Sequence, residues 1–395
     1  MRQTGAIRVL FSSTRGAGHL NPLLPFADAC RRAGDEALIC GPPPAAAAVE
    51  SSGHAFWELA APPGDELDAV WSTVPSLPPE EQNAVVIREI FGRLNTSAAL
   101  PRLRQACEEW RPDVVVRETA EYGSALAAEL HGIPHARVGI GLSSMEELGL
   151  RVAAAAVDDL RRAAELPADP AAETLRRSPY LTVFPASLED PAVPEQPQTL
   201  RFHDPAWDDD HASELPTRWN GSEAPLVYVT FGSVAGGMEM AAHVYGAAML
   251  AVSDLPVRAL FTVGHDIDFD SLPPAPGNVR VERWVPQADV FPHAAAIVCH
   301  GGAGSTLGAL AAGLPLVVVP LFADQPYNAS RVGAVGAGLA VAPEPSAIRG
   351  ALHRVLQEES YREAARRLAA EMRAQPSVDA AVDMLGALAR GAPAA

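Results

Sequence analysis

The sequence predicts an α/β protein of two doubly wound, parallel-sheet domains that face one another across a cleft. Short β-branched runs alternate with helical stretches from IRVLFSS (residues 7–13) to LPLVVVP (residues 314–320). Such alternation is typical of parallel strands joined by right-handed crossovers. The 395 residues exceed one hydrophobic core, and the periodicity stops between residues 185 and 225. Open parallel sheets bind ligands at the carboxyl ends of their strands, so we expect the ligand site in the cleft.

The two halves begin alike, each with a strand followed by a glycine-containing loop, VLFSSTRGAG and VYVTFGSVAGG. We therefore divide the chain into a first domain (residues 1–205), a linker rich in Pro and Asp (206–223), a second domain (224–360) and C-terminal helices (361–395). The helix predicted after the first strand places Leu23, Leu24, Ala27 and Cys30 on one face, which should pack on the sheet. Segments 61–100 and 141–180 are less regular and are interpreted either as surface helices or as walls of a pocket.

Composition excludes several classes of function. The formal net charge of -18 argues against nucleic acid or an anionic membrane as the main partner. The chain contains no lysine, which excludes a phosphate-loop lysine, a Schiff base and a lysine general base. The four cysteines lack zinc or disulfide spacing, and the N-terminal apolar run is too short for a signal peptide, so we expect a cytoplasmic protein. The uncharged stretch 290–323 is broken by Gly and Pro and is interpreted as buried elements rather than a membrane span.

A histidine and several glycines follow the strand AAIVC, at the start of a predicted helix. Gly302 and Gly304 leave the backbone N–H groups open to an anion, and the helix N-terminus carries partial positive charge. Ser305 and Thr306 add hydroxyl donors. The stretch therefore predicts a phosphate-binding loop without lysine, although a tight turn that only requires close packing would use the same glycines.

Three motifs occur in a fixed order: WVPQ at 284–287, HGGAGST at 300–306 and DQPYNA at 324–329. Together they resemble the donor-binding signature of the GT-B family 1 glycosyltransferases, especially the bacterial enzymes that decorate antibiotics. STRGAGHLNPLLPFA, at residues 13–27, resembles the opening of the family's acceptor domain. The resemblance covers nearly the whole chain. It implies a GT-B fold of two Rossmann-like domains, with the acceptor bound by the first and the nucleotide sugar by the second, and C-terminal helices that cross back.

The resemblance also implies roles for donor-site residues. Trp284 would stack on the base beside Val285, and Gln287 would hydrogen-bond the base edge; a tryptophan in the core is the alternative. Asp324 and Gln325 would hold hydroxyls of the sugar, although Asp324 could instead cap a helix. The diphosphate would be bound by His300, by the loop after it and by the loop after VYVT: Gly302, Gly304, Ser305, Thr306, Gly232 and Ser233.

This chain departs from the family pattern at Gly308, where plant members and several others have a Glu that clamps the ribose hydroxyls. Its absence favours a 2'-deoxyribose donor, and we expect a dTDP-linked deoxysugar. No other cofactor is expected. No HExxH or DxD arrangement occurs, and Asp208–Asp210 lie in the acidic linker, so we expect no metal site.

His19, in the loop and helix after the first strand, is implied as the general base that deprotonates the acceptor, and an imidazole suits that task near neutral pH. A histidine capping the helix is the alternative. A carboxylate should orient the base. Glu118 and Glu121 both follow the strand DVVV; we choose Glu118 because relatives place an Asp at that strand end.

A dinucleotide-binding function is disfavoured, because Asn21 replaces the third glycine and no acidic residue ends the second strand. The sequence therefore predicts an inverting, metal-independent glycosyltransferase that moves a sugar from a dTDP-sugar to a polyketide-type natural product, through oxygen or carbon. Alternatives are a UDP-glucose-dependent enzyme that inactivates a macrolide, a nucleotide-sugar 2-epimerase, and a catalytically silent donor-binding helper. The expected partners are the small-molecule acceptor and the nucleotide sugar, with a homodimer possible and no membrane insertion.

Overall fold

The computed structural model describes residues 5–207, 215, 223–232, 240–264 and 267–391. The chain divides into two compact units. The first unit comprises Met1–Val183, Pro191–His203 and Pro376–Ala395, and the second comprises Phe184–Asp190 and Asp204–Gln375. The chain thus returns to the first unit at its C-terminal end.

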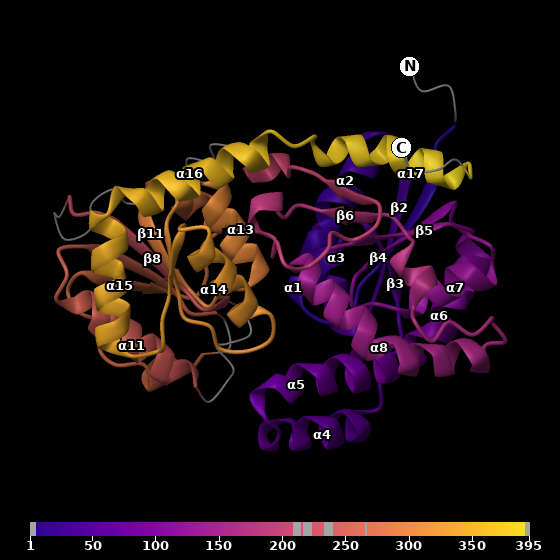
Figure 1. Ribbon diagram of the computed structural model, residues 1–395, viewed down its shortest axis with the longest axis horizontal. Helices are drawn as coiled ribbons and strands as arrows, with labels where there is room; N and C mark the ends of the chain where they lie inside the picture. The colour runs from indigo at the N-terminus through magenta and orange to yellow at the C-terminus, as the bar shows by residue number, and fades with distance from the viewer. Residues whose placement is uncertain (1–4, 208–214, 216–222, 233–239, 265–266, 392–395) are drawn as a thin grey trace. The chain divides into compact units, whose positions relative to one another are not determined.

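A seven-stranded sheet forms the centre of the first unit, and every pair of neighbouring strands in it is parallel (Figure 1). Its order is β3-β2-β1-β4-β5-β6-β7. The strands are β1 (Arg8–Ser12), β2 (Glu36–Gly41), β3 (Ala55–Glu58), β4 (Val114–Glu118), β5 (His135–Val138), β6 (Tyr180–Thr182) and β7 (Thr199–Arg201).

Helices cover both faces of this sheet, because successive strand residues point to opposite sides. Val9 and Phe11 of β1 pack in the cluster that includes α2 and α17, whereas Leu10 packs in the cluster that includes α6 and α7. The helices are α1 (Ala17–Leu20), α2 (Leu24–Arg32), α3 (Ala46–Ser51), α4 (Gly64–Thr73), α5 (Pro79–Val85), the π-helix η4 (Val86–Asn95), α6 (Thr96–Trp110), α7 (Gly123–Leu130), α8 (Ser143–Ala163), α9 (Glu173–Arg176) and α17 (Ala381–Ala389).

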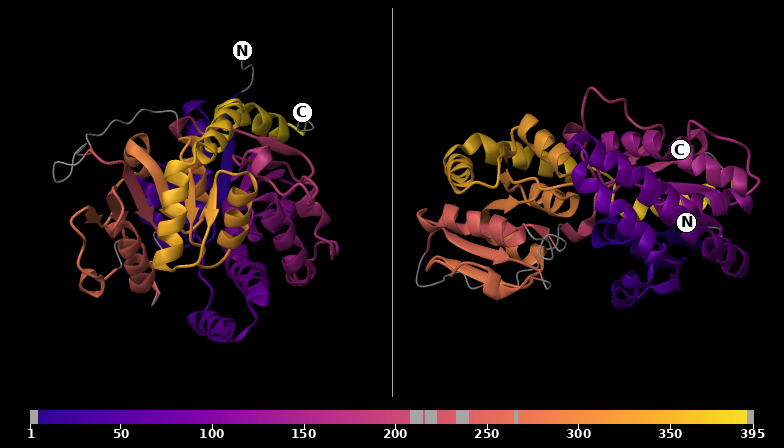
Figure 2. Two further views of the ribbon diagram at one scale, coloured as in Figure 1. Left: turned by 60° about the vertical axis from the view of Figure 1, so that its left-hand side comes forward. Right: turned by 90° about the horizontal axis from the view of Figure 1, so that it is seen from below.

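The second unit contains a six-stranded parallel sheet, in the order β10-β9-β8-β11-β12-β13. Figure 2 shows its strands and helices in colours from salmon to yellow. Its strands are β8 (Leu226–Thr230), β9 (Arg258–Thr262), β10 (Val279–Glu282), β11 (Ala294–Cys299), β12 (Leu316–Val318) and β13 (Gly338–Ala340). Its helices are α11 (Ala241–Ser253), α12 (Gln287–Val290), α13 (Ala303–Ala311), α14 (Gln325–Ala334), α15 (Pro345–Gln357) and α16 (Glu359–Arg373). The 3₁₀ turns of the two units are η1 (Asn21–Leu23), η2 (Pro43–Ala45), η3 (Val74–Ser76), η5 (Ala186–Leu188), η6 (Pro205–Trp207), η7 (Phe269–Ser271), η8 (Phe291–His293) and η9 (Val378–Ala380).

The predicted class, an α/β protein with two parallel doubly wound sheets, is confirmed. Four short strands, β3, β6, β7 and β13, were not among the predicted runs. The structure also shows where the C-terminal helices, predicted from residue 361, return to the first unit. Helix α16 packs against α13, with the Arg373 guanidinium donating to the Ala311 carbonyl at 3.2 Å, so the return to the first unit falls at Pro376.

Strand order places the candidate residues in both units. In each sheet the direction of winding reverses at a switch point, between β1 and β4 in the first unit and between β8 and β11 in the second. Ligands bind at the carboxyl ends of strands beside such points. In the first unit His19 follows β1, and Glu118 is the last residue of β4. In the second unit Gly232 follows β8, and His300 follows β11.

Candidate active site

His19 and Glu118 lie together at the carboxyl edge of the first sheet. Gly16 adopts a φ of 114°, which a side chain would disfavour, and the four-residue helix α1 begins directly after it. The turn brings Nδ1 of His19 to 3.0 Å from Oε1 of Glu118. The Glu118 side chain is fully buried, whereas that of His19 is 20% exposed. The pair therefore joins an imidazole that solvent can reach to a carboxylate that solvent cannot.

Thr14 and the turn after β4 fix the Glu118 carboxylate. The Thr14 hydroxyl donates to Oε1 at 2.7 Å, and its backbone N–H donates to the same oxygen at 3.2 Å. The Thr14 hydroxyl also lies 2.9 Å from Nδ1 of His19. Oε2 accepts from the Ala120 N–H at 2.5 Å. Thr14 was missed at the sequence level, although a hydroxyl residue so soon after β1 could have suggested it.

Glu118 is held in its ionised form. Burial works to raise its pKa, but the positive field of His19 and the hydrogen bonds from His19, Thr14 and Ala120 together leave the pKa below the ordinary value. A buried carboxylate in this state orients an imidazole and stabilises the imidazolium that forms when the ring accepts a proton.

The Glu121 carboxylate contacts Ser124 rather than His19. Its two oxygens each accept from the Ser124 N–H at 3.1 Å, and Oε2 also accepts from the Ser124 hydroxyl, in the first turn of α7. Burial raises the pKa of Glu121, with the Ser124 hydrogen bonds opposing that effect. Of the two glutamates left open by the sequence, the structure brings Glu118 to His19.

Phe91 covers part of the His19 ring from the π-helix η4. The two ring centroids are 5.2 Å apart, with the planes tilted by 32°. Gly92 packs closely on α8, where an added Cβ would lie 3.1 Å from Cβ of Ala153. Wide helical turns of this kind are frequent at functional sites. Phe91 lies in segment 61–100, which the sequence left open as surface helices or as walls of a pocket.

The loop after β11 surrounds His300 with bare backbone. Gly301 has a φ of 87°, and Gly302 precedes α13 at the N-cap position. A Cβ added at Gly232 would lie 2.8 Å from Nε2 of His300, and one at Gly302 would collide with the same atom. Both glycines are thus required for the ring to lie between them. Burial lowers the pKa of His300 to about 4, so the imidazole is neutral near neutral pH and offers an N–H donor.

The other residues predicted for nucleotide binding lie around the same helix. Gln287, at the start of α12, donates to the Ser305 hydroxyl at 2.9 Å. Ser305 and Thr306 are buried in α13, whereas Gly304 is exposed with nothing within 4 Å of an added Cβ. Val285 is half-buried beside Trp284, which is 64% exposed and so is no part of the core. Ser233 lies outside the described residues, as do Asp208–Asp210.

Asp324 and Gln325 stand at the start of α14. The Gln325 side chain is buried and its Oε1 accepts from the N–H groups of Leu321 and Phe322, so that oxygen fixes the preceding turn. Asn328 links Asp324 to the loop after β11: its amide donates to Oδ2 of Asp324 and to the Gly301 carbonyl, both at 2.8 Å. Asn328 belongs to the DQPYNA motif, but nothing in the sequence singled it out within that motif.

Gly308 faces an aromatic ring. A Cβ added there would lie 2.7 Å from Cε2 of Phe291, which itself packs edge-on against Tyr228. The position where the resemblance expects a ribose-clamping Glu is therefore closed by Phe291.

Two further observations concern the described part of the chain. No three His, Cys, Asp or Glu side chains gather there in a way that could hold a metal ion. No helix there is both long enough and apolar enough to span a bilayer.

Comparison with known proteins agrees with this arrangement. Two parallel doubly wound sheets with these loops define a GT-B glycosyltransferase, and the chain aligns with solved enzymes of that class. SnogD of Streptomyces nogalater has a TM-score of 0.77 at 24% identity over 98% of this chain and 100% of its own. SsfS6 of Streptomyces sp. SF2575, complexed with thymidine diphosphate, has a TM-score of 0.77 at 25% identity over 96% and 99%.

The sequence comparisons define the family. Residues 79–205 match the N-terminal domain, and residues 252–388 the C-terminal domain, described as erythromycin biosynthesis protein CIII-like. L-demethylnoviosyl transferase of Streptomyces niveus is 30% identical over 94% of this chain and 95% of its own. Elloramycin glycosyltransferase ElmGT of Streptomyces olivaceus is 29% identical over 94% of both chains. The chain belongs to this family of antibiotic glycosyltransferases, as the sequence motifs predicted.

Proposed function

We propose that the chain transfers a deoxysugar from a dTDP-sugar to a polyketide-type natural product with inversion at the anomeric carbon. The pairing of His19 with the buried, ionised Glu118 is the observation that carries this proposal. His19 accepts the proton of an acceptor hydroxyl as the acceptor oxygen bonds to C1 of the sugar. The bond from C1 to the diphosphate oxygen breaks on the opposite face. Attack from that face inverts the centre.

The same base serves a C-linked product. An aromatic carbon activated by a phenol attacks C1, and His19 takes the proton that the phenol or the ring releases. A positioned general base contributes about 10²- to 10⁴-fold in rate. Glu118 contributes by holding Nδ1 in a fixed tautomer and by stabilising the imidazolium.

The leaving diphosphate is stabilised in the second unit without a metal. The neutral His300 donates one N–H, and the backbone N–H groups at the start of α13 and the helix dipole add fixed positive potential. Preorganised donors of this kind stabilise charge that develops in the transition state. Trp284, exposed on the same unit, supplies a stacking surface for the base.

Three observations support a thymidine nucleotide. Gly308 has no side chain to clamp a ribose 2'-hydroxyl, and Phe291 closes the space beside it. One relative, 25% identical, is named TDP-daunosamine transferase DnrS, of Streptomyces peucetius. The SsfS6 structure contains thymidine diphosphate.

Thermal-shift measurements with TDP, UDP and GDP test the nucleotide. We expect TDP to raise the melting temperature most. An equal or larger shift with UDP would contradict the thymidine proposal. Incubation of a dTDP-deoxysugar with an aromatic polyketide acceptor, followed by NMR of the anomeric proton, then tests transfer and inversion; retention of the anomeric configuration would exclude direct displacement.

A further inference from the structure

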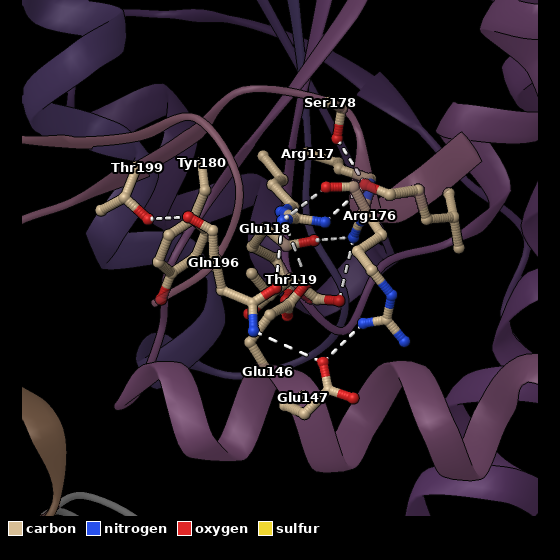
Figure 3. Close-up of polar contacts among 12 residues, drawn as sticks. Arg117, Glu118, Thr119, Glu146, Glu147, Arg176, Ser178, Tyr180, Gln196 and Thr199 are labelled. Atoms are coloured by element: carbon tan, nitrogen blue, oxygen red, sulfur yellow. Dashed lines mark hydrogen bonds and ion pairs between the residues drawn. The ribbon is translucent and has the colours of Figure 1, made fainter. Parts of the chain in front are cut away.

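Arg117 is a fully buried cation on the strand that ends in Glu118. Neighbouring side chains on a strand point to opposite faces, so Arg117 approaches the turn after β4 from the side away from the carboxylate. A single guanidinium nitrogen, Nη1, donates to the carbonyls of Glu118 at 3.1 Å and Thr119 at 2.9 Å (Figure 3). The same nitrogen donates to the carbonyl of Glu121 at 3.2 Å. The turn from 118 to 121 therefore receives three hydrogen bonds from one nitrogen atom of Arg117.

The same turn fixes the catalytic carboxylate. The Glu121 N–H donates to the Glu118 carbonyl at 3.1 Å, and the Ala120 N–H donates to Oε2 of Glu118. A change in the path of the turn therefore moves the donor on Oε2, and with it the oxygen that meets Nδ1 of His19. An unbroken set of hydrogen bonds leads from Arg117 to the imidazole.

Burial of this guanidinium is energetically unfavourable. Among the described residues, Nε and Nη2 of Arg117 are buried without a hydrogen-bond acceptor, and the Tyr122 ring lies 5.5 Å from Cζ. Unsatisfied buried donors destabilise a fold. The charged and titratable groups around Arg117 are Glu118 and Glu121 of the turn, His135 and Arg137 of β5, and Glu146 of α8. An apolar residue of similar size would pack there at lower cost, so packing alone does not account for an arginine at this position.

We propose that Arg117 is a positioning residue for the acid–base pair: it tethers the turn 118–121 so that the Glu118 carboxylate stays in register with Nδ1 of His19. The inference rests on the proposed function of His19 as base. It adds a residue that touches neither substrate nor imidazole and acts only through the turn.

Arg117→Met removes the donors and keeps most of the stem. We expect kcat to fall roughly 10- to 100-fold, since small misplacements away from the chemistry have effects of that size. Loss of the Glu118 contact also disfavours the protonated imidazole. The acid limb of the kcat/KM profile should therefore move to lower pH. Affinity for TDP should not change.

Arg137→Met is the matched control. Arg137 is equally buried, and its guanidinium donates to the carbonyls of Leu175 and Arg176 rather than to the 118–121 turn. The Arg137→Met variant should have a lower melting temperature, and the acid limb of its kcat/KM profile should stay at the wild-type pH. Arg117→Lys should recover most of kcat, because one ammonium offers three donors.

A substrate-free readout separates this inference from the proposed function. In protein labelled with [15N]histidine, the His19 signals, assigned by difference from His19→Ala, should show the Nδ1–H tautomer in the wild type and in Arg137→Met. In Arg117→Met they should shift toward Nε2–H. An unchanged tautomer together with an unchanged pH limb would overturn the positioning role, even if transfer is observed. If Arg117→Met does not fold, Arg117→Gln, which is too short to reach all three carbonyls, takes its place with the same deciding outcomes.

Discussion

Nδ1 of His19 lies 3.0 Å from Oε1 of Glu118, although 99 positions separate the two residues in the chain. Strands β1 and β4 are neighbours, with Ser12 paired to Arg117, so the loop after one strand meets the end of the other. The contact is therefore a product of the doubly wound strand order. It is also the contact on which catalysis depends in this account.

Glu118→Gln should reduce transfer by roughly 10²- to 10⁴-fold, because the amide keeps the size of the carboxylate but cannot stabilise an imidazolium. TDP affinity, measured by calorimetry, should be unchanged, since the loop that we propose binds the nucleotide belongs to the second unit. Glu121→Gln is the control: the Glu121 carboxylate accepts from the Ser124 N–H in the first turn of α7, so the variant should lose stability and retain transfer at a permissive temperature. Equal loss of activity in both variants would mean that the turn, rather than the Glu118 charge, is required.

The two glutamates should contribute to stability with opposite dependence on pH. The pKa of Glu118 is lowered below its ordinary value, so its ionised form stabilises the fold above the unfolded pKa, and that contribution is lost as pH falls through the folded pKa. The pKa of Glu121 is raised, so its contribution is present below the unfolded pKa and lost as pH rises through the folded one. Urea denaturation across the acid range measures the free energy of unfolding of each protein. The difference between the wild type and Glu118→Gln should grow as pH rises. The difference between the wild type and Glu121→Gln should decline as pH rises. If both differences changed with pH in the same direction, the opposite pKa shifts assigned to Glu118 and Glu121 would be contradicted.

Gly308→Ala should destabilise the second unit, because its Cβ would lie 2.7 Å from Cε2 of the buried Phe291 ring. Overpacking typically costs about 1–3 kcal/mol, which exceeds the gain of about 1 kcal/mol expected from replacing glycine in a helix. Gly304→Ala, in the same helix with open space around it, should be neutral or stabilising. Melting temperatures of the two variants decide the point. A similar shift for both would show that Phe291 does not restrict position 308.

Trp284→Ala should weaken TDP binding by about 10- to 100-fold, given that stacking on a base contributes about 1–3 kcal/mol. The free energy of unfolding should hardly change, because Trp284 is 64% exposed. Trp71→Ala, which removes another exposed tryptophan but on α4 of the first unit, should leave TDP affinity as it is. Titration calorimetry on both variants provides the comparison, and unaltered binding by Trp284→Ala would place the base elsewhere.

Local pattern was enough to predict the strands that are long and β-branched, and the glycine loops that follow β1, β8 and β11. It was not enough for β6, β7 and β13, because three residues carry no period, and β7 lies in a stretch rich in Pro and Gln. The π-helix at Val86–Asn95 has a period that a search for 3.6-residue repeats does not detect.

The same distinction applies to the site. His19, Glu118 and His300 stand next to strand ends and could be named from spacing and resemblance. Thr14 and Arg117 could not, because their roles consist of contacts made after folding: Thr14 meets Glu118 across 104 positions, and Arg117 meets carbonyls, which any residue provides. Arginine inside a buried strand was nevertheless a visible signal, since charged residues are almost never fully buried without partners.

The most direct test of the account is to measure TDP binding and sugar transfer side by side in His19→Ala. The account predicts wild-type TDP affinity, because the diphosphate is bound by the loop around His300, together with a loss of transfer to hydroxyl acceptors of roughly 10²-fold or more. Near-normal turnover with intact TDP binding would contradict it, since the proton would then leave the acceptor by another route.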